Sequence, residues 1–373
     1  MSTLAVNSIT KADGGVYYFE NKNLLINGGQ NVWQRSTSVT GISSGAYHTV
    51  DRWYLNNTGG GGTMRFTMAR STTVPTGEGH GYSMKLDTTT ADTGLSTDGE
   101  VVFLQRIEGQ NLQRIKKGTS SADKLTASFW VKSNKTGTFT IELYDNDNTR
   151  QNSTTYTISS ADTWEQKTVT FNADTTGTLG NDNNTSLQLI FWLAAGTNFT
   201  GGSFTDNAWA SVTAANRVHS SQVNIADSTD NEWLITGIQL EQGAAATDFE
   251  FEPYDMVLQK CQRYLYMSPE YGQSITQGSG VVDIATWHTY FSAANMAELA
   301  NFHFPVTMRA NPTITLSSES GTIGKMTERT SGGGAVADVD PHATGSTTQS
   351  VRVLEYAEQS YGLGANLKAD AEL

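Results

Sequence analysis

Short runs in which apolar and polar residues alternate recur along this chain, and polar or glycine-rich turns separate them. The clearest runs are residues 125–131, 139–143, 169–171, 187–193 and 234–240. A period of two residues indicates a strand with one buried face. About eight such strands with irregular spacing, and no fixed-period repeat, favour a two-sheet jelly roll over a solenoid.

One of these runs is apolar on both sides. In residues 187–193 the leucines and Phe191 share one side, while Ile190 and Trp192 lie on the other. A strand with this pattern is expected to be covered on both faces.

Helical spacing occurs in residues 255–267, where apolar side chains recur at intervals of three and four residues after Pro253. Residues 270–373 then return to alternation. A single hydrophobic core stops growing at roughly 250–300 residues, so a chain of 373 residues is expected to hold two domains. The expected organisation is an all-β fold of four segments: an N-terminal arm (1–22), a jelly roll (23–252), a linker helix (253–269) and a smaller β-domain (270–373).

The charge and composition exclude several classes of partner. The net charge is −13 and no basic cluster exceeds the pair Lys116–Lys117, so nucleic acid is not expected as a partner. No apolar run approaches the roughly 20 residues of a membrane span, and the N-terminus has no secretory signal. Cys261 is the single cysteine, so no disulfide framework can form. A protein of this kind that acts outside the cell would need another route of release, such as lysis of the cell in which it is made.

No cofactor or metal site is expected. The six histidines lack metal-ligand spacing. Residues 145–149 (DNDNT) are similar to a calcium loop, but Arg150 stands where the sharp turn needs glycine, and Tyr156 where a bidentate glutamate is needed. A polar hairpin turn is the expected structure there.

Several segments carry a resemblance to a known family. They are NLLING at residues 23–28, Trp33-Gln34-Arg35, Asp51-Arg52-Trp53, residues 233–254, residues 261–264, residues 302–316 and the final ADAEL at 369–373. In this order they resemble the jelly-roll module and tip domain of bacteriophage tail-fibre and receptor-binding proteins. The opening MSTLAVNSIT resembles fibres of marine cyanophages. The jelly roll is also similar to carbohydrate-binding modules of bacterial glycanases, although Gly29-Gln30-Asn31 replaces the aromatic and acidic residues found after Asn-Gly in many of them. No metal site is therefore carried over from these modules.

The resemblance implies a non-enzymatic virion fibre or adhesin that recognises a host cell-surface glycan, lipopolysaccharide or capsule, during phage adsorption. It implies docking to other virion structural proteins through residues 1–22. A homotrimer is expected from the resemblance together with the small charged fraction of 16%. Two alternatives stay open: a polysaccharide depolymerase, since carboxylates are numerous, and a capsid decoration protein without a receptor role.

Aromatic side chains are the candidate glycan contacts, because sugar rings present flat C–H faces that pack on aromatic rings. The tryptophans in or beside strands are expected in the core, namely Trp33, Trp53, Trp130, Trp164 and Trp233. Trp209 lies instead in a polar, glycine-rich stretch, with Phe204, Asp206 and Asn207 nearby. These four residues are the leading site candidates, followed by Trp287, Tyr290, Tyr271 and Tyr361 in the C-terminal domain.

Overall fold

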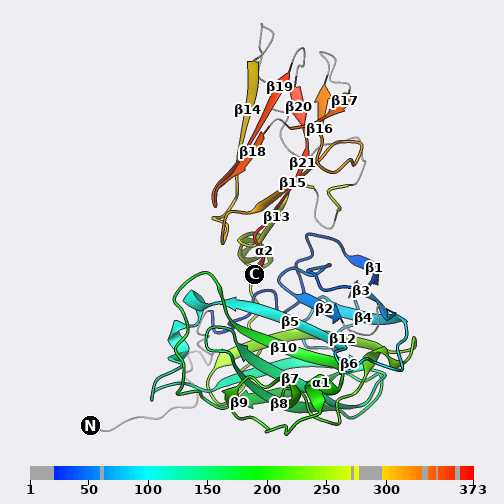
Figure 1. The fold of residues 1–373 in the computed structure, drawn as a ribbon, viewed down its shortest axis with the longest axis vertical. Coiled ribbons are helices and arrows are strands. Elements are labelled where there is room, and N and C mark those ends of the chain that lie inside the picture. Colours follow the sequence, from blue (N-terminus) through cyan, green and yellow to red (C-terminus); the bar gives the residue numbers. More distant parts are fainter. Residues whose placement is uncertain are drawn as a thin grey trace.

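The computed structural model describes residues 21–58, 63–269, 273–276, 296–329, 335–341, 343–357 and 362–373. A broad β-sandwich forms the base of the molecule and a slender β-domain stands on it (Figure 1). The expected fold class is confirmed: an all-β protein with a jelly-roll sandwich, a short helix and a smaller second β-domain. The assignment of residues 1–22 to an attachment arm lies almost entirely outside the described residues.

The sandwich consists of two antiparallel six-stranded sheets, here called sheet A and sheet B. Sheet A has the order β1 (Ser38–Ile42), β3 (Arg65–Ser71), β4 (Ser83–Thr90), β12 (Glu232–Gln242), β6 (Leu125–Ser133) and β9 (Glu165–Phe171). Sheet B has the order β11 (Ala210–Ser211), β8 (Arg150–Ile158), β7 (Gly137–Asp145), β10 (Thr185–Ala195), β5 (Glu100–Glu108) and β2 (Tyr54–Thr58). Every strand predicted from alternation in residues 125–240 is present.

The main core lies between the two sheets, where the apolar sides of the alternating strands meet. The rings of Trp53 and Phe103 stack there, with centroids 4.8 Å apart. Core positions are confirmed for Trp33, Trp53 and Trp233, which are fully buried. The same expectation is wrong for Trp130 and Trp164, which are half-buried. Trp130 occupies an outward position of β6, because its neighbours at 129 and 131 point into the core.

Strand β10 is buried on both faces, as its sequence predicts. Its outward side chains Ile190 and Trp192 form a second cluster with Val102, Leu104 and Val218. The connection after β10 covers this cluster and contains helix α1 (Thr197–Thr200). Four single-turn 3-10 helices complete the sandwich, at Gly109–Asn111, Gln113–Ile115, Ala214–Asn216 and Ile225–Asp227.

The second domain starts after helix α2 (Tyr254–Gln262), which is shorter than the predicted 255–267. Leu265 leaves the helix because its backbone pairs with Asp370 in a sheet. The domain contains three three-stranded sheets among its described residues. They are β13 (Leu265–Met267), β21 (Asn366–Asp370) and β15 (Thr313–Ser317); β14 (Met296–His303), β19 (Ser350–Ala357) and β18 (Ala343–Ser346); and β17 (Ala335–Val339), β16 (Met326–Arg329) and β20 (Gly362–Gly364).

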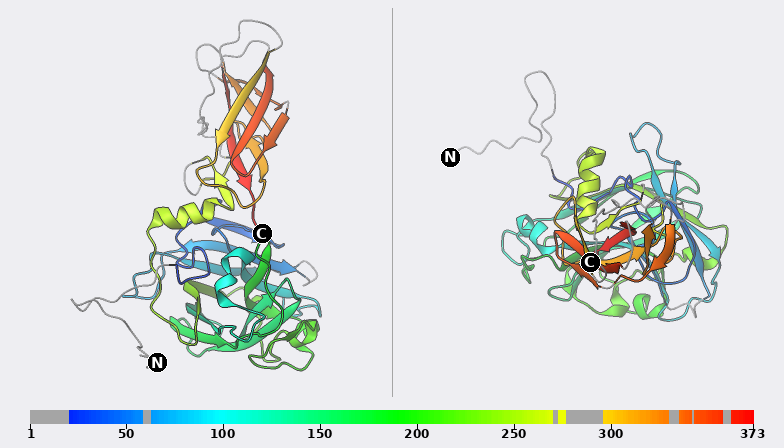
Figure 2. Two further views of the ribbon diagram at one scale, coloured as in Figure 1. Left: turned by 90° about the vertical axis from the view of Figure 1, so that its left-hand side faces the viewer. Right: turned by 90° about the horizontal axis from the view of Figure 1, so that it is seen from above.

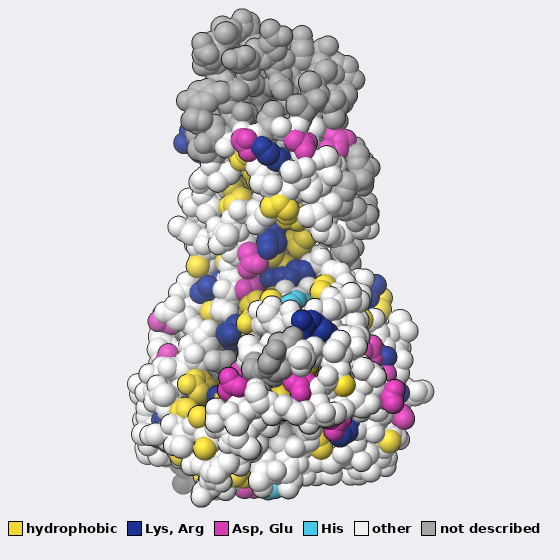
Figure 3. All heavy atoms as spheres, turned by 45° about the vertical axis from the view of Figure 1, so that its right-hand side comes forward, with side chains coloured by type: hydrophobic (Ala, Val, Ile, Leu, Met, Phe, Trp, Pro, Cys, Tyr) yellow, Lys and Arg dark blue, Asp and Glu magenta, His cyan; other side chains and the backbone are white. Residues whose placement is uncertain are grey.

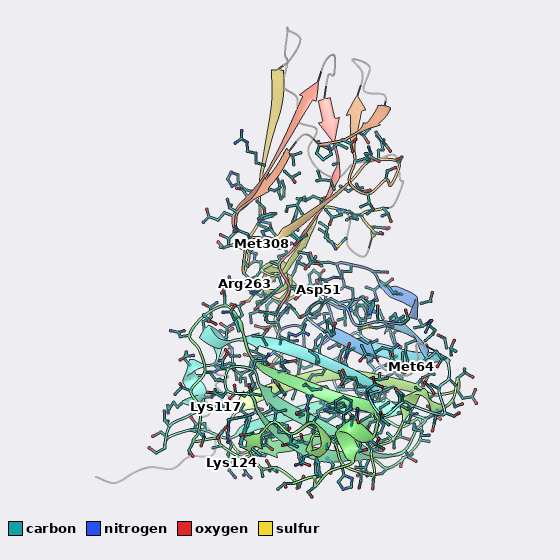
Figure 4. All side chains as sticks on the ribbon, viewed as in Figure 1. Asp51, Met64, Lys117, Lys124, Arg263 and Met308 are labelled. Atoms are coloured by element: carbon teal, nitrogen blue, oxygen red, sulfur yellow. The ribbon has the colours of Figure 1, made fainter. Side chains whose placement is uncertain are left out.

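The final residues return to the junction between the two domains, where α2 also lies (Figure 2). Asp51, Arg263 and Met308 all lie near this junction (Figure 4). Acidic and basic side chains gather at this narrow waist (Figure 3). The described helices are all too short or too polar to cross a membrane.

Candidate functional site

The loop residues predicted from the sequence lie at the edge of sheet B. Many of their hydrogen-bonding groups already have partners within the protein. Trp209 is half-buried against the main core, and its Nε1 donates a hydrogen bond to the Asn172 carbonyl at 2.7 Å. Asn207 Nδ2 donates to the Thr170 carbonyl at 2.8 Å. Thr154 Oγ1 donates to Asp206 Oδ1 at 2.7 Å.

Phe204 does not share a ring contact with Trp209. Its ring packs edge-on against His219, with centroids 5.2 Å apart, whereas the Trp209 ring lies 5.0 Å from the Lys117 ammonium. The second-rank candidates Trp287, Tyr290, Tyr271 and Tyr361 lie outside the described residues.

A groove that the sequence did not single out crosses the outer face of sheet B. It has a volume of about 320 Å³. Its walls come from outward positions of four strands and two connections: Tyr54 and Asn56; Glu100, Val102, Leu104 and Arg106; Tyr144 and Asn146; Gln188, Ile190 and Trp192; and Arg217. These positions alternate with the core residues of the same strands, so their side chains all point to the same face of the sheet. We call this feature the sheet B groove.

One end of the groove is built around a buried carboxylate. Glu142 lies beneath the groove and accepts hydrogen bonds from Arg217 Nε at 2.9 Å and Nη2 at 3.0 Å. Trp192 Nε1 donates to the same carboxylate at 2.8 Å. The Arg217 guanidinium carbon lies 4.9 Å from the Tyr144 ring centroid and 5.0 Å from that of Trp192. A bidentate ion pair holds Arg217 rigid, so the adjacent Tyr144 ring is held in place.

The other end repeats the pairing of a guanidinium with an aromatic ring. The Arg106 guanidinium carbon lies 4.4 Å from the Tyr54 ring centroid. Tyr47 packs edge-on against Tyr54, with centroids 5.1 Å apart, and its hydroxyl accepts a hydrogen bond from Arg106 Nη1 at 3.1 Å. Two tyrosines therefore flank the groove, and each is held by a cation–π contact with the planar guanidinium of an arginine.

Polar groups lie between the two tyrosines. Asn56 Nδ2 donates to Glu100, and Gln188 Nε2 donates to Asn146 Oδ1 at 2.7 Å. Burial raises the pKa of Glu100, against the lowering effect of the Arg217 charge. Amides and a carboxylate between aromatic rings can hydrogen-bond the hydroxyls of a sugar whose C–H face packs on those rings.

The calcium-like sequence at residues 145–149 forms the turn of the β7–β8 hairpin, as predicted. Asp145 is paired there with the Lys117 ammonium. Within the described ranges, no three His, Cys, Asp or Glu side chains are placed to hold a metal ion.

No protein-family model matches the sequence, and the comparison with curated proteins found no match. Solved structures give distant likenesses. The enzymatically active domain of bacteriophage CBA120 tailspike protein 4 is 14% identical with a TM-score of 0.28, over 59% of this chain but 21% of that one. The family 11 carbohydrate-binding module from Clostridium thermocellum, in complex with a β-1,3-1,4-mixed-linked tetrasaccharide, is 13% identical with a TM-score of 0.28, over 58% of this chain and 99% of the module.

A third structure is the carbohydrate-binding module TmCBM61 in complex with β-1,4-galactotriose. It is 8% identical with a TM-score of 0.29, over 60% of this chain and 99% of the module. The chain is thus distantly similar in structure to carbohydrate-binding modules and to a phage tailspike domain, and no sequence family is identified.

Proposed function

We propose that this protein binds a polysaccharide in the sheet B groove, and that it does so as a phage fibre or adhesin on a host-cell surface. The observation that carries the first part is the pair of tyrosines held by arginines on either side of amide and carboxylate groups. An open groove of this kind fits an extended chain of sugar units better than a compact small molecule, which would need a more enclosed cavity.

The groove is organised before a ligand arrives, and this favours binding. Tyr144 and Arg217 are fixed by the buried Glu142, while Tyr54 and Arg106 are fixed by Tyr47. Rigid aromatic anchors lose little conformational freedom when they pack on a ligand, so more of the contact energy appears as affinity.

We propose binding without cleavage. Glycoside hydrolysis generally uses two carboxyl groups that flank the scissile bond. Glu142 is held beneath the groove by three donors, which leaves Glu100 as the carboxylate that lines the groove. Incubation with host envelope polysaccharide should therefore release no new reducing ends, and their appearance would favour the depolymerase alternative.

The virion setting comes from the sequence resemblance. On this proposal the protein is a homotrimer made in the host cytoplasm, it docks to other virion proteins through residues 1–22, and it is released by lysis. Light scattering that gives a single-chain mass of 40.3 kDa would contradict the trimer. Immunogold labelling of virions distinguishes a tail fibre from a capsid decoration protein.

The groove is tested with two tyrosine variants on an array of host lipopolysaccharide and capsule fragments. Tyr144→Ala and Tyr54→Ala should each weaken binding by about tenfold or more, the scale of a lost aromatic contact. Tyr254→Ala is the matched control, because this exposed tyrosine lies on α2, away from the groove. Wild-type affinity in both groove variants would exclude the groove, and failure of the wild type to bind any fragment would exclude the function.

A further inference from the structure

We propose that the sandwich carries a second glycan site, on the outer face of sheet A, which accepts neutral or amino-bearing sugars and disfavours acidic ones. The site is a pocket of about 580 Å³, lined by Trp130, His80, Phe249 and Phe251 together with polar and acidic side chains. We call it the sheet A pocket. This inference rests on the proposed glycan-binding function but uses none of the residues of the sheet B groove.

The pocket lies on the opposite side of the sandwich from the groove. Trp130 and Gln166 are paired positions on β6 and β9 of sheet A, and Trp130 points outward because Phe129 and Val131 lie in the core. The remaining walls come from the connection before β4, which carries Glu78 and His80, and from the segment after β12. A ligand held here would leave the groove on sheet B open.

Three aromatic rings pack against one another along one wall. Phe249 and Phe251 pack edge to face, with centroids 4.9 Å apart and planes at 77°. His80 lies 5.1 Å from Phe249 and 5.2 Å from Phe251. Phe251 is 55% exposed, so its ring is accessible to a ligand in the pocket. The angled rings offer both faces and edges to the C–H surface of a sugar.

The backbone of sheet A is shaped to admit these rings. Gly237 lies in a bulge of β12 with a φ of +60°, and a Cβ there would come within 2.6 Å of the His80 ring and 3.4 Å of Trp130. Gly79 has a φ of +81°, and a Cβ there would lie 3.1 Å from Phe251. Glycines at a bulge with positive φ allow rings to approach the backbone closely, and such bulges are frequent beside binding sites.

His80 is a buried polar group of this wall that stays unsatisfied. It is 8% exposed, and its Nδ1 has no hydrogen-bond partner among the described residues. Burial lowers the pKa of His80 to about 4, so the ring is neutral at physiological pH. The neutral ring can therefore serve as an aromatic surface in the wall of the pocket.

The charges of the pocket select the class of sugar. Glu78, Asp248 and Glu250 line it, against the single cation Lys22. Glu250 accepts the backbone N–H groups of Asn21 and Asn23, and Lys22 Nζ donates to Thr247 Oγ1. Glu78 and Gln166 are exposed at the rim, where they can bond hydroxyl or ammonium groups. An excess of carboxylates repels a uronic acid and favours neutral or amino-bearing sugars.

The experiment is saturation-transfer NMR with three soluble probes: a neutral cello-oligosaccharide, a glucosamine oligomer and a galacturonic acid oligomer. The background is Tyr144→Ala, in which the groove is weakened. We expect binding of the first two probes to persist and that of the galacturonate to be at least tenfold weaker. Adding Trp130→Ala or Phe251→Ala to this background should reduce the remaining signal to the part that the weakened groove supplies.

Phe251→Ala is included because this side chain is already largely exposed, so its removal should not disturb folding. Thr168→Ala is the control, an exposed outward position two residues from Gln166 on β9. The double variant Glu78→Gln/Asp248→Asn should reduce the difference in binding affinity between the neutral and the acidic probes.

Each outcome bears on one claim. If Phe251→Ala and Trp130→Ala leave the residual binding of the Tyr144→Ala protein unchanged, the second site is excluded while the groove stands. If no probe and no host fragment binds the wild type, both proposals fail. If the pocket variants convert a wild-type oligomer into monomers, the pocket is a contact between copies and the proposed site is wrong.

Discussion

The guanidinium carbon of Arg52 lies 3.4 Å from the centroid of the Tyr264 ring, so a sandwich arginine stacks directly on the second domain. Arg52 also forms a buried ion pair with Glu372, 320 residues away in the chain. Tyr264 donates its hydroxyl hydrogen bond to Glu108, which is paired in turn with Arg263. These contacts join the two domains through buried or partly buried ion pairs, which are screened less than surface pairs.

Removing one member of this ion pair should loosen the junction. Arg52→Met leaves Glu372 in a buried position with Arg35 as its remaining partner, and breaking a buried pair costs about 3–5 kcal/mol of unfolding free energy. Adding Glu372→Leu should recover part of that loss, because it removes the buried carboxylate that has lost its Arg52 partner. Urea unfolding measures the unfolding free energy of the single and the double variant. The control is Arg70→Met, which removes a half-buried arginine stacked on Tyr82 of the sandwich; equal losses in Arg52→Met and Arg70→Met would contradict the role of Arg52 in joining the domains.

Two buried groups should make stability depend on pH with opposite signs. Burial raises the pKa of Asp51 from 3.8 to about 6, despite the lowering effect of Arg35. The folded state therefore holds this proton more tightly, and the stability it contributes is present below pH 3.8 and lost as pH rises to about 6. Burial lowers the pKa of His80 from 6.5 to about 4. Its contribution is present above pH 6.5 and lost as pH falls to about 4.

Asp51→Asn separates these two effects. Without the Asp51 titration, the unfolding free energy should fall more steeply than that of the wild type as pH is lowered from 6.5 to 4. His80→Phe should produce the reverse, with stability rising on acidification. Urea unfolding at half-unit steps of pH measures both slopes, and NMR titration of His80 gives its pKa directly. Parallel slopes in all three proteins would show that folding shifts the pKa of neither group.

The fold was largely predictable because alternation reports which side of a strand meets the core. The strand at 187–193 is covered on both faces, as Ile190 and Trp192 indicated. The function of the polar residues beside the tryptophans was not predictable. Trp33 and Trp53 enter the core, but Gln34 and Arg52 bind the second domain, through the carbonyl of Leu265 and the carboxylate of Glu372. Partners more than 200 residues away leave no local signal.

The groove could not be predicted from the sequence for a related reason. Tyr54, Tyr144 and Trp192 lie on β2, β7 and β10, and they share a surface only because the sheet order places β5 and β10 between β2 and β7. Alternation gives the side of a strand and not its neighbours. The apolar Trp192 on an outward face was the available signal, and it indicated burial rather than a binding surface.

Trp209 can be tested with two substitutions that separate packing from recognition. Trp209→Phe keeps an aromatic face but loses the hydrogen bond to the Asn172 carbonyl, so unfolding free energy should fall by about 1 kcal/mol with glycan binding retained. Trp209→Ala removes the ring and, on the sequence-based prediction, should weaken binding by about 1–3 kcal/mol. Calorimetry of unfolding and of binding measures both. Unchanged binding in Trp209→Ala would remove this residue from the glycan site.

A buried ammonium occupies a cage of oxygen atoms at the edge of the sandwich (Figure 4). Lys117 is paired with Asp145, and its Nζ lies 3.0 Å from Asp174 Oδ2, 3.1 Å from the Thr176 carbonyl and 3.0 Å from the Gly177 carbonyl. The lysine side chain is 4% exposed. Both carboxylates are therefore neutralised by a charge that the chain itself supplies, with Arg150 as a second partner of Asp174.

Lys117→Met should be among the most destabilising single changes in the sandwich, because it leaves Asp145 buried without a cation. The expected loss of unfolding free energy is about 3–5 kcal/mol. Lys116→Met is the matched control at the neighbouring position, since Lys116 is 56% exposed and lies 3.8 Å from Asp123, a type of pair worth at most about 1 kcal/mol. Adding Asp145→Asn to Lys117→Met should restore part of the loss, since the asparagine carbonyl can still accept the Asn148 N–H bond without an unpaired charge. Similar urea midpoints for Lys116→Met and Lys117→Met, or no recovery in the double variant, would show that the cage does not depend on the lysine charge.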